Sequence, residues 1–314
     1  MAWLSVIFLV LGFVFLSHSA AEAIRRVVKI SRLMGVSEAA VSFAIVGTMA
    51  ILPEFSIGIN SALGGNSSLG LGLVFGSNIA DLTLVIGLVA LASREISLKK
   101  AVIEHSNLLL ALAIMPVVFL FDGEISRPEG FLLVASFFLY TFYILKTKNG
   151  HSNTFFSSAS KNLVIDFIVL AGAVAVLLVS GHFIAQAASE ISLFLAIPVF
   201  FVGIVLAIGT CLPELTLAMQ ASNKHHAELG LGDILGNVFA DCTLTLGVIA
   251  MISPIKPGFT LLALASGVFM ALALLVVLAL FKDRQTISRK EGMMLIILYI
   301  VFLASQFLLE KVFA

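Results

Sequence analysis

The chain has 314 residues, of which 60% are hydrophobic and only 11% are charged, and its mean hydropathy is +1.14. Soluble domains carry about 25% charged residues, and a chain of this length cannot bury so much apolar surface and keep a polar exterior. The 18 basic and 18 acidic residues balance, which excludes a strongly basic nucleic-acid-binding protein. The two cysteines, Cys211 and Cys242, exclude a disulfide-stapled scaffold. The sequence therefore predicts an integral membrane protein.

Ten apolar runs are long enough to cross a bilayer, whose hydrocarbon core takes about 20 helical residues. The connections between them are short, so we expect a single all-α membrane domain. After the first run, Ser19-Ala20-Ala21 also permits a cleaved signal peptide, but no Lys or Arg precedes the run and its length favours a retained helix. In chain order, the predicted spans cover about residues 2–22, 36–62, 69–92, 102–121, 129–146, 162–184, 194–221, 229–252, 258–281 and 292–309.

A polar stretch at residues 147–161, rich in Ser and Asn, divides the chain into residues 1–146 and 162–314. Arg127, Lys256 and Lys311 fall on one side of the predicted spans, and the remaining 15 of the 18 basic residues fall on the other. The positive-inside rule then places the linker in the cytoplasm and both termini outside the cell membrane. A wrong number of spans would scramble this distribution, so it also supports the count of ten.

The two parts share a repeat in which residue n matches residue n+160. Each copy holds five predicted spans, and an odd number means that the second copy enters the membrane from the opposite face. Two inverted five-helix repeats are typical of secondary transporters, whose ion sites lie near the bilayer midplane. General similarity between packed helices is the alternative, but it does not account for repeated acids. The matches include Leu52-Pro53-Glu54 with Leu212-Pro213-Glu214, Gly70-Leu71-Gly72 with Gly230-Leu231-Gly232, Gly76 with Gly236, and Ala80-Asp81 with Ala240-Asp241.

Four acidic residues fall deep within the predicted spans: Glu54, Asp81, Glu214 and Asp241. Each costs about 3 kcal/mol there if it is ionised and unpaired. No Lys or Arg occupies the same spans at comparable depth. The compensating charge is therefore a bound cation or bound protons, and carboxylate oxygens suit hard cations such as Ca²⁺. Protonated carboxyl groups that hydrogen-bond for packing are the alternative interpretation.

Proline precedes both glutamates, and a proline inside a helix frees a backbone carbonyl one turn earlier. Such an opened backbone is tolerated in a membrane where it lines a cavity. On the partner spans, residues four apart share a helix face, which groups Ser77 with Asp81 and Asn237 with Asp241 and Thr245. The repeated glycines are expected to allow close helix packing rather than to bind ions.

Residues 209–214 (GTCLPE) and 236–241 (GNVFAD), with residues 47–54 (GTMAILPE) and 76–81 (GSNIAD), resemble the paired motifs of the cation/Ca²⁺ exchanger superfamily. The resemblance is greatest to its prokaryotic sodium/calcium exchanger branch. That family carries two inverted repeats, each with a G-T-S-L-P-E-like segment and a later G-S-N-x-x-N/D segment. The resemblance covers essentially the whole chain.

The resemblance implies a set of ion-binding residues. Glu54 and Glu214 would bind Ca²⁺, with the backbone carbonyls near Ala50 and Thr210 completing the shell. The resemblance also implies that the first helix of each half slides against the other eight during transport. The coupling cation, Na⁺ or H⁺, would be held by positions in and beside the later motifs: Ser77, Asn78, Asp81, Cys211, Asn237 and Asp241.

The first copy departs from the family pattern, because Ala50-Ile51 stands where the family has Thr-Ser. In the second copy, Cys211 and Asn237 replace serines. Hydroxyl groups at such positions help to hold Na⁺ in the family, whereas Ile cannot act as a ligand and Cys is a soft one. Asp81 adds an acid where Asn is common. These changes suggest a shift of the counter-ion from Na⁺ toward H⁺ as an alternative.

Two further classes compete with an exchanger. A cation channel needs weak sites that continue across the membrane, which one central acidic cluster does not provide. Residues 230–233 (GLGD) match an intramembrane aspartyl protease motif, but the repeat partner of Asp233 is Leu73 and no second catalytic segment is evident. The adjacent His225 and His226 are interpreted as solvated loop residues rather than a metal site.

The sequence thus predicts a non-enzymatic, secondary-active antiporter that exchanges Ca²⁺ for Na⁺ by alternating access. Its fold is an all-α integral membrane protein with ten transmembrane helices in two inverted five-helix repeats. It needs no cofactor, its partners are inorganic cations and the lipid bilayer, and neither nucleic acid nor a protein partner is predicted.

Overall fold

The computed structural model describes residues 2–33, 50–93, 95–97, 106–147, 163–223, 227–284 and 286–313. Nearly all of these residues are helical, as the sequence predicts. The first part of the chain forms α1 (Ala2–Leu33), α4 (Leu52–Leu63), α5 (Ser67–Ala80), η2 (Asp81–Val85), α6 (Ile86–Ser93), β1 (Glu95–Ser97), α8 (Ser106–Phe119), η3 (Leu120–Asp122) and α9 (Arg127–Thr147). The second part forms α10 (Leu163–Leu195), α11 (Val199–Thr210), α12 (Leu212–Asn223), α13 (Ala227–Ala240), η4 (Asp241–Thr245), α14 (Leu246–Ile252), α15 (Thr260–Arg284), β2 (Thr286–Ser288) and α16 (Arg289–Phe313).

Seven helical segments of the described chain are long and apolar enough to cross a membrane, and each coincides with a predicted span. The chain is therefore a multi-pass membrane protein. The other three predicted spans fall on α4, α8 and α9. Residues 36–49 and 102–105 of these spans lie outside the described residues, so the count of ten stays a prediction. The predicted linker at 147–161 lies outside the described residues except for Thr147. The seven segments are Ser5–Ile30, Ser67–Ser93, Leu163–Leu195, Val199–Thr216, Ile234–Ile252, Thr260–Lys282 and Arg289–Glu310.

The first helix of each half is longer than predicted. Helix α1 continues to Leu33 rather than ending near residue 22, and α10 continues to Leu195 rather than 184. In α1 the extension follows from helical charge spacing, since Glu22 pairs with Arg25 at 2.9 Å and with Arg26 at 2.7 Å. Pairs three and four residues apart stabilise a helix beyond the apolar run on which the prediction rests.

The predicted span at 194–221 is two helices, α11 and α12, with Cys211 as the turn between them. Pro213 lies in the first turn of α12 and has no N–H to donate to the carbonyl of Gly209. The corresponding α4 begins with Leu52-Pro53, directly after a turn at Ile51. The second half therefore interrupts a helix immediately before its Pro-Glu pair, as the sequence predicts, and in the first half a helix begins at the corresponding pair.

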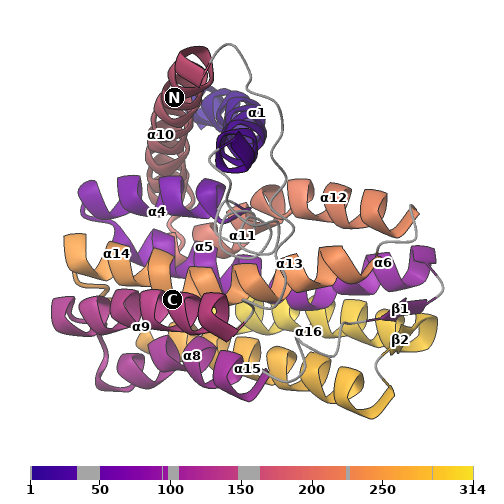
Figure 1. Ribbon diagram of the computed structural model, residues 1–314. Helices are drawn as coiled ribbons and strands as arrows, with labels where there is room; N and C mark the ends of the chain where they lie inside the picture. Colours follow the sequence, from indigo (N-terminus) through magenta and orange to yellow (C-terminus); the bar gives the residue numbers. More distant parts are fainter. Residues whose placement is uncertain are drawn as a thin grey trace.

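The helices pack in layers, with α1 and α10 set apart from the others (Figure 1). These two long helices lie side by side at one end of the stack and cross the remaining helices steeply, making their main further contacts with α4 and α11. Helices α5 and α11 pack closely in the interior. The remaining layers pair α14 with α9, α16 with α6, and α15 with α8.

Glycine explains the close approach of α5 and α11. A Cβ atom on Gly72 would overlap the backbone carbonyl of Phe200, and one on Gly203 would overlap that of Leu69. A Cβ on Gly76 would lie 2.9 Å from Cα of Ile204. The prediction that these motif glycines serve packing is confirmed for the first copy of the repeat, which brings α5 with its acid against α11 of the other half.

Two short strands correct the purely helical prediction. β1 and β2 pair antiparallel with Ile96 opposite Ile287, and an isolated bridge joins Ile125 to Ile255. Extended loop residues near a membrane surface must satisfy their backbone N–H and C=O groups, and pairing loops from different halves achieves this. The hydropathy pattern carries no signal for such short pairings.

A second repeated segment lies at the starts of α9 and α16. A comparison of residue n with residue n+160 does not detect it. Residues 125–130 read ISRPEG and residues 287–292 read ISRKEG, an offset of 162. In the first, the backbone N–H of Ser126 donates to the Glu129 carboxylate at 2.8 Å, and in the second the backbone N–H of Ser288 donates to the Glu291 carboxylate at 2.7 Å. Each pair is a capping box that starts the following helix.

The glycine after each capping box packs on the other half of the chain. A Cβ on Gly130 of α9 would lie 2.7 Å from the carbonyl oxygen of Gly247 in α14. A Cβ on Gly292 of α16 would lie 2.9 Å from the carbonyl oxygen of Gly87 in α6. Since Gly87 and Gly247 are themselves repeat partners, the two contacts are reciprocal, and the repetition extends from sequence to packing.

Candidate functional site

Glu54 and Glu214 occupy matching positions in the first turns of α4 and α12. The Glu54 side chain is buried, and the Oε2 atom of Glu214 is buried although the residue as a whole is half-buried. The N-terminus of a helix carries partial positive charge, which favours a carboxylate in its first turn. The interrupted helices therefore hold both glutamates inside the protein, next to a break in backbone hydrogen bonding.

Asp81 and Asp241 each begin a π-helical turn, η2 and η4. A π-turn inserts one extra residue into an α-helix and is frequent at functional sites. Thr83 and Thr243, two residues after each acid, donate their hydroxyls to Ile79 O and Phe239 O. The same distortion thus begins at the acid in both halves, and both aspartates are buried.

Hydrogen bonds from both halves of the chain hold the Asp241 carboxyl group. Thr245 Oγ1 donates to Asp241 Oδ1 at 2.9 Å from one turn along the same helix. Ser77 Oγ lies 3.4 Å from Asp241 Oδ2 and comes from α5 in the first half. Ser77 also donates to the carbonyl of Val74 at 3.1 Å. The Ser77 hydroxyl, which helical spacing groups with Asp81, thus lies next to the acid of the other half in the structure.

The four carboxyl groups lie near one another in the interior. Glu54 and Glu214 interact electrostatically, and each also interacts with Asp81 and Asp241. Within the described residues, none of the four forms an ion pair with Lys, Arg or His. The arrangement concentrates acidic groups from both halves without a protein counter-charge.

Several oxygens in this cluster are buried and accept no hydrogen bond from a described residue: Glu54 Oε2, Asp81 Oδ1, Glu214 Oε2 and Asn237 Oδ1. A buried acceptor without a donor costs about 1–3 kcal/mol, and more if it is charged. A bound hard cation or a proton would remove this cost. However, no three of the described His, Cys, Asp and Glu side chains converge closely enough to share one metal ion. In this conformation the carboxyls are distributed around the cluster rather than closed on one position.

The other predicted residues lie around these acids. The side chain of Thr210 faces Glu54, while its hydroxyl donates to Ala207 O at 3.1 Å. Cys211 and Asn237 both face Asp81, and Cys211 Sγ lies 3.5 Å from Ser77 O. Ala50 is half-buried and immediately precedes the turn at Ile51.

Asn78 has different partners from the other predicted residues. Its Nδ2 donates to Cys242 Sγ at 3.3 Å and to Met270 Sδ at 3.6 Å, and no described carboxyl accepts from it. All three residues are buried. The structure thus places Asn78 against two sulfur atoms rather than against a carboxyl group. Asn78 and Cys242 directly follow Ser77 and Asp241 along the chain, so the two contacts between the halves are neighbours.

Sequence reasoning misses Tyr299 of α16. Its hydroxyl is buried, has no hydrogen-bond partner among the described residues and interacts electrostatically with Asp81 and Cys211. The available signal is a phenol inside the apolar run of residues 295–303. Helical spacing groups Thr245 with Asp241 but does not assign it to the site, although its hydroxyl makes the shorter hydrogen bond to that acid.

The protease-like motif and the histidines are only partly described by the structure. The side chain of Asp233 and both His225 and His226 lie outside the described residues. His18 and His182 are exposed on α1 and α10. The glycines of the protease-like motif at 230–233 are likewise not described beyond their helical backbone in α13.

Comparison with known proteins gives a consistent result. The sequence profile of the family described as sodium/calcium exchanger protein matches residues 4–146 and again residues 165–308. The sodium/calcium exchanger MaX1 of Methanosarcina acetivorans is 24% identical over 352 residues, covering 98% of this chain and 99% of MaX1. The inner membrane protein YrbG of Escherichia coli is 23% identical over 321 residues, covering 98% of both chains.

A solved structure has the same fold. The sodium-calcium exchanger NCX_Mj soaked with 2.5 mM Na⁺ and 1 mM Sr²⁺ superimposes with a TM-score of 0.69 at 23% identity, covering 97% of this chain and 99% of the other. Because the family profile matches both halves, the repeat found in the sequence is a repeat of the family. The chain therefore belongs to the sodium/calcium exchanger protein family, as a multi-pass membrane antiporter.

Proposed function

We propose that this protein exchanges Ca²⁺ for Na⁺ by alternating access at the acidic cluster. One observation carries the proposal: four buried carboxyl groups from two repeats meet without a basic partner among the described residues, and three of them present an oxygen without a donor. A site made of several carboxylates and other oxygen ligands suits Ca²⁺. The transported ion then supplies the charge that the protein lacks.

Roles within the cluster follow from position. Glu54 and Glu214 bind Ca²⁺ at the helix breaks, with backbone carbonyls near Ala50 and Thr210. Coupling ions occupy the positions around the aspartates, formed by Ser77, Asn78, Asp81, Cys211, Asn237 and Asp241. Because the described carboxyls do not converge on one position, Ca²⁺ binding draws them together, and their dispersal accompanies replacement of Ca²⁺ by monovalent ions.

Exchange rather than uniport follows from electrostatics. Occluding the cluster with four ionised carboxylates and no cation is costly at membrane depth. The protein therefore changes its orientation only when Ca²⁺ or a sufficient number of monovalent cations neutralises the site. This requirement couples the outward movement of one ion to the inward movement of the other.

The moving elements are α1 and α10, which slide together over the other helices. They pack on each other and stand apart from the layered stack (Figure 1). In this proposal residues 1–146 and 162–314 form two inverted repeats of five spans each, joined by a cytoplasmic linker at 147–161, with both termini outside the cell membrane.

The test is Ca²⁺ uptake into proteoliposomes that contain the purified protein. We expect saturable uptake that requires an outward Na⁺ gradient, and we expect Glu54→Gln or Glu214→Gln to abolish it. Glu124→Gln is the matched control, since this surface residue pairs only with Lys256 in the described chain. Wild-type flux in a Glu54→Gln/Glu214→Gln double variant would refute the site, and unitary currents would identify a channel instead.

Protons are the second candidate counter-ion, and Asp81 is the observation that favours them. This acid lies beside Cys211 and Asn237, which replace hydroxyl ligands, and its Oδ1 has no donor among the described residues. A carboxylate binds a proton without needing a shell of further oxygens. Imposing Na⁺-only and H⁺-only gradients on the same vesicles separates the two, because uptake driven only by Na⁺ eliminates the proton alternative.

A further inference from the structure

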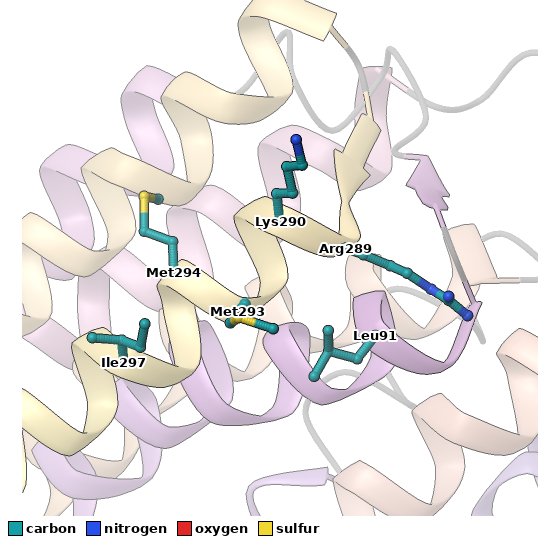
Figure 2. A pocket seen from close by; sticks show the side chains of 6 residues that line it. All are labelled: Leu91, Arg289, Lys290, Met293, Met294 and Ile297. Carbon is teal, nitrogen blue, oxygen red and sulfur yellow. The ribbon is translucent and has the colours of Figure 1, made fainter.

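A groove of about 640 Å³ lies on the outer surface between α6 and α16, away from the acidic cluster (Figure 2). Leu91 of α6 lines one wall, and Met293, Met294 and Ile297 of α16 line the other together with Arg289 and Lys290. Met293, Met294 and Ile297 are 55%, 44% and 54% exposed. Because Arg289–Glu310 is long and apolar enough to cross the membrane, we expect these exposed side chains to face lipid.

The two charged residues begin α16 at one end of the groove, and in Figure 2 their side chains extend in different directions. Figure 2 shows Leu91 pointing toward α16 beside Met293, while Arg289 and Lys290 extend from the end of α16 that follows β2. Both are exposed, and neither forms an ion pair with a described residue. The groove is therefore cationic at one end and apolar along its length.

In the sequence, the segments that flank this end of the groove carry more basic than acidic residues, the acids being Glu95 and Asp283. β1 and β2 pair next to it, and five more basic residues flank the two strands along the chain: Arg94, Lys99, Lys100, Lys282 and Arg284. The nearby Glu291 accepts hydrogen bonds from the N–H and the hydroxyl of Ser288, both at 2.7 Å, so its carboxylate is engaged at the start of α16. Arg289 and Lys290, the two charged residues that line the groove, therefore make this end suitable for an anionic group.

The dimensions suit one leaflet of a bilayer. Arg289 and Ile297 are eight residues apart, which is about 12 Å along an α-helix. Half of the hydrocarbon core is about 15 Å thick. A molecule whose anionic group contacts Arg289 and Lys290 would thus place an apolar chain along Met293 and Ile297 down to about the middle of the bilayer.

We propose that this groove binds an anionic phospholipid, with its headgroup phosphate at Arg289 and Lys290 and an acyl chain along Leu91, Met293 and Ile297. Basic pockets between membrane helices are a known way of recognising such headgroups. The proposal does not depend on which ions are exchanged, because the groove shares no side chain with the acidic cluster.

Lipid binding to the full-length, delipidated protein tests the proposal. Phosphatidylglycerol and phosphatidylcholine with identical acyl chains are titrated separately, and bound lipid is counted by native mass spectrometry. We expect wild type to bind phosphatidylglycerol preferentially. Each basic residue near an anionic lipid contributes about fivefold in affinity, so Arg289→Gln/Lys290→Gln should bind phosphatidylglycerol roughly 30-fold more weakly.

A matched control removes two other exposed lysines, Lys146 and Lys256, which do not line the groove and do not flank its basic end. Lys146→Gln/Lys256→Gln should keep wild-type preference. Equal affinity of wild type for the two lipids, or unchanged phosphatidylglycerol binding in Arg289→Gln/Lys290→Gln, would overturn the proposal, since either result describes ordinary annular lipid.

A second variant tests the apolar part independently of charge. Met293→Trp/Ile297→Trp fills the groove and should lower phosphatidylglycerol affinity while both cations remain. Glycerol 3-phosphate at millimolar concentration should leave bound phosphatidylglycerol in place, because it lacks the acyl chains. Displacement by glycerol 3-phosphate, together with unchanged binding in the tryptophan variant, would identify a soluble-phosphate site and overturn the lipid assignment.

Discussion

Ser77 of the first repeat lies 3.4 Å from Asp241 of the second, measured between Oγ and Oδ2. This contact joins α5 to the π-turn η4. The Ser77 hydroxyl lies between the Asp241 carboxyl group and the carbonyl of Val74 in α5. The two halves of the site are thus directly connected at a position that the proposed mechanism assigns to a coupling ion. A conformational change that separates the repeats would have to break this contact.

Replacing Ser77 by Ala should weaken counter-ion binding. Asp241 would keep only the hydrogen bond from Thr245, and a coupling ion would lose one hydroxyl ligand. A single hydrogen bond of this kind contributes about 1 kcal/mol, so the Na⁺ concentration for half-maximal Ca²⁺ uptake should rise about fivefold. Ser136→Ala is the control, because that hydroxyl donates only to Leu133 O in α9. An unchanged Na⁺ dependence would contradict the role of Ser77.

Acidification should inhibit Ca²⁺ uptake. Protons compete with Ca²⁺ for the carboxylates, so occupancy by Ca²⁺ is greatest at high pH and is lost progressively as the pH falls. Asp81→Asn removes one of the four proton-binding groups and should make this dependence less steep. Initial rates of Na⁺-driven uptake across a pH series, at constant Ca²⁺, measure the effect. If uptake is accelerated by acid on the Ca²⁺-binding side, the competition is disproved.

The parts of the site that depend on residue identity can be predicted from the sequence. Pro-Glu pairs and buried aspartates repeat at one offset, and a charge in an apolar span has few explanations, so the sequence alone identifies Glu54, Asp81, Glu214 and Asp241. Helical spacing groups Ser77 with Asp81 and Asn237 with Asp241, and Cys211 is added by the family resemblance.

The remainder depends on tertiary contacts that a linear pattern does not contain. Tyr299 reaches the cluster from α16, more than 200 residues after Asp81, and nothing in its neighbourhood marks it except its hydroxyl. The π-turns lengthen two helices by one residue without a composition signal. The repeated capping boxes escape a search at one offset because the offset changes from 160 to 162 within the second half.

Gly72→Ala should destabilise the protein strongly. The new Cβ would overlap the carbonyl of Phe200, so α5 and α11 would have to separate at the place where their backbones touch. Overpacking of this kind costs about 1–3 kcal/mol. Gly172→Ala is a matched control, since it lies in α10 with nothing within 4 Å of the added Cβ. Thermal unfolding in detergent should show a lower Tm for Gly72→Ala alone; equal Tm values would show that the helices tolerate separation.

Asp166→Asn should loosen the pairing of α1 and α10. The Asp166 carboxylate, only 1% exposed, pairs with Arg26 at 2.6 Å and Lys29 at 2.8 Å across the two helices. Because both basic partners are partly exposed, we expect a loss of stability that lies between the losses typical of surface and of buried ion pairs. Glu22→Gln is the control, since its ion pairs lie within α1 and contribute about 0.5 kcal/mol. Chemical unfolding measures the free energy of unfolding of both variants, and equal losses would mean that Asp166 does not hold the two helices together.

If α1 and α10 slide as one unit, Asp166→Asn should also slow Ca²⁺ exchange, whereas Glu22→Gln should not.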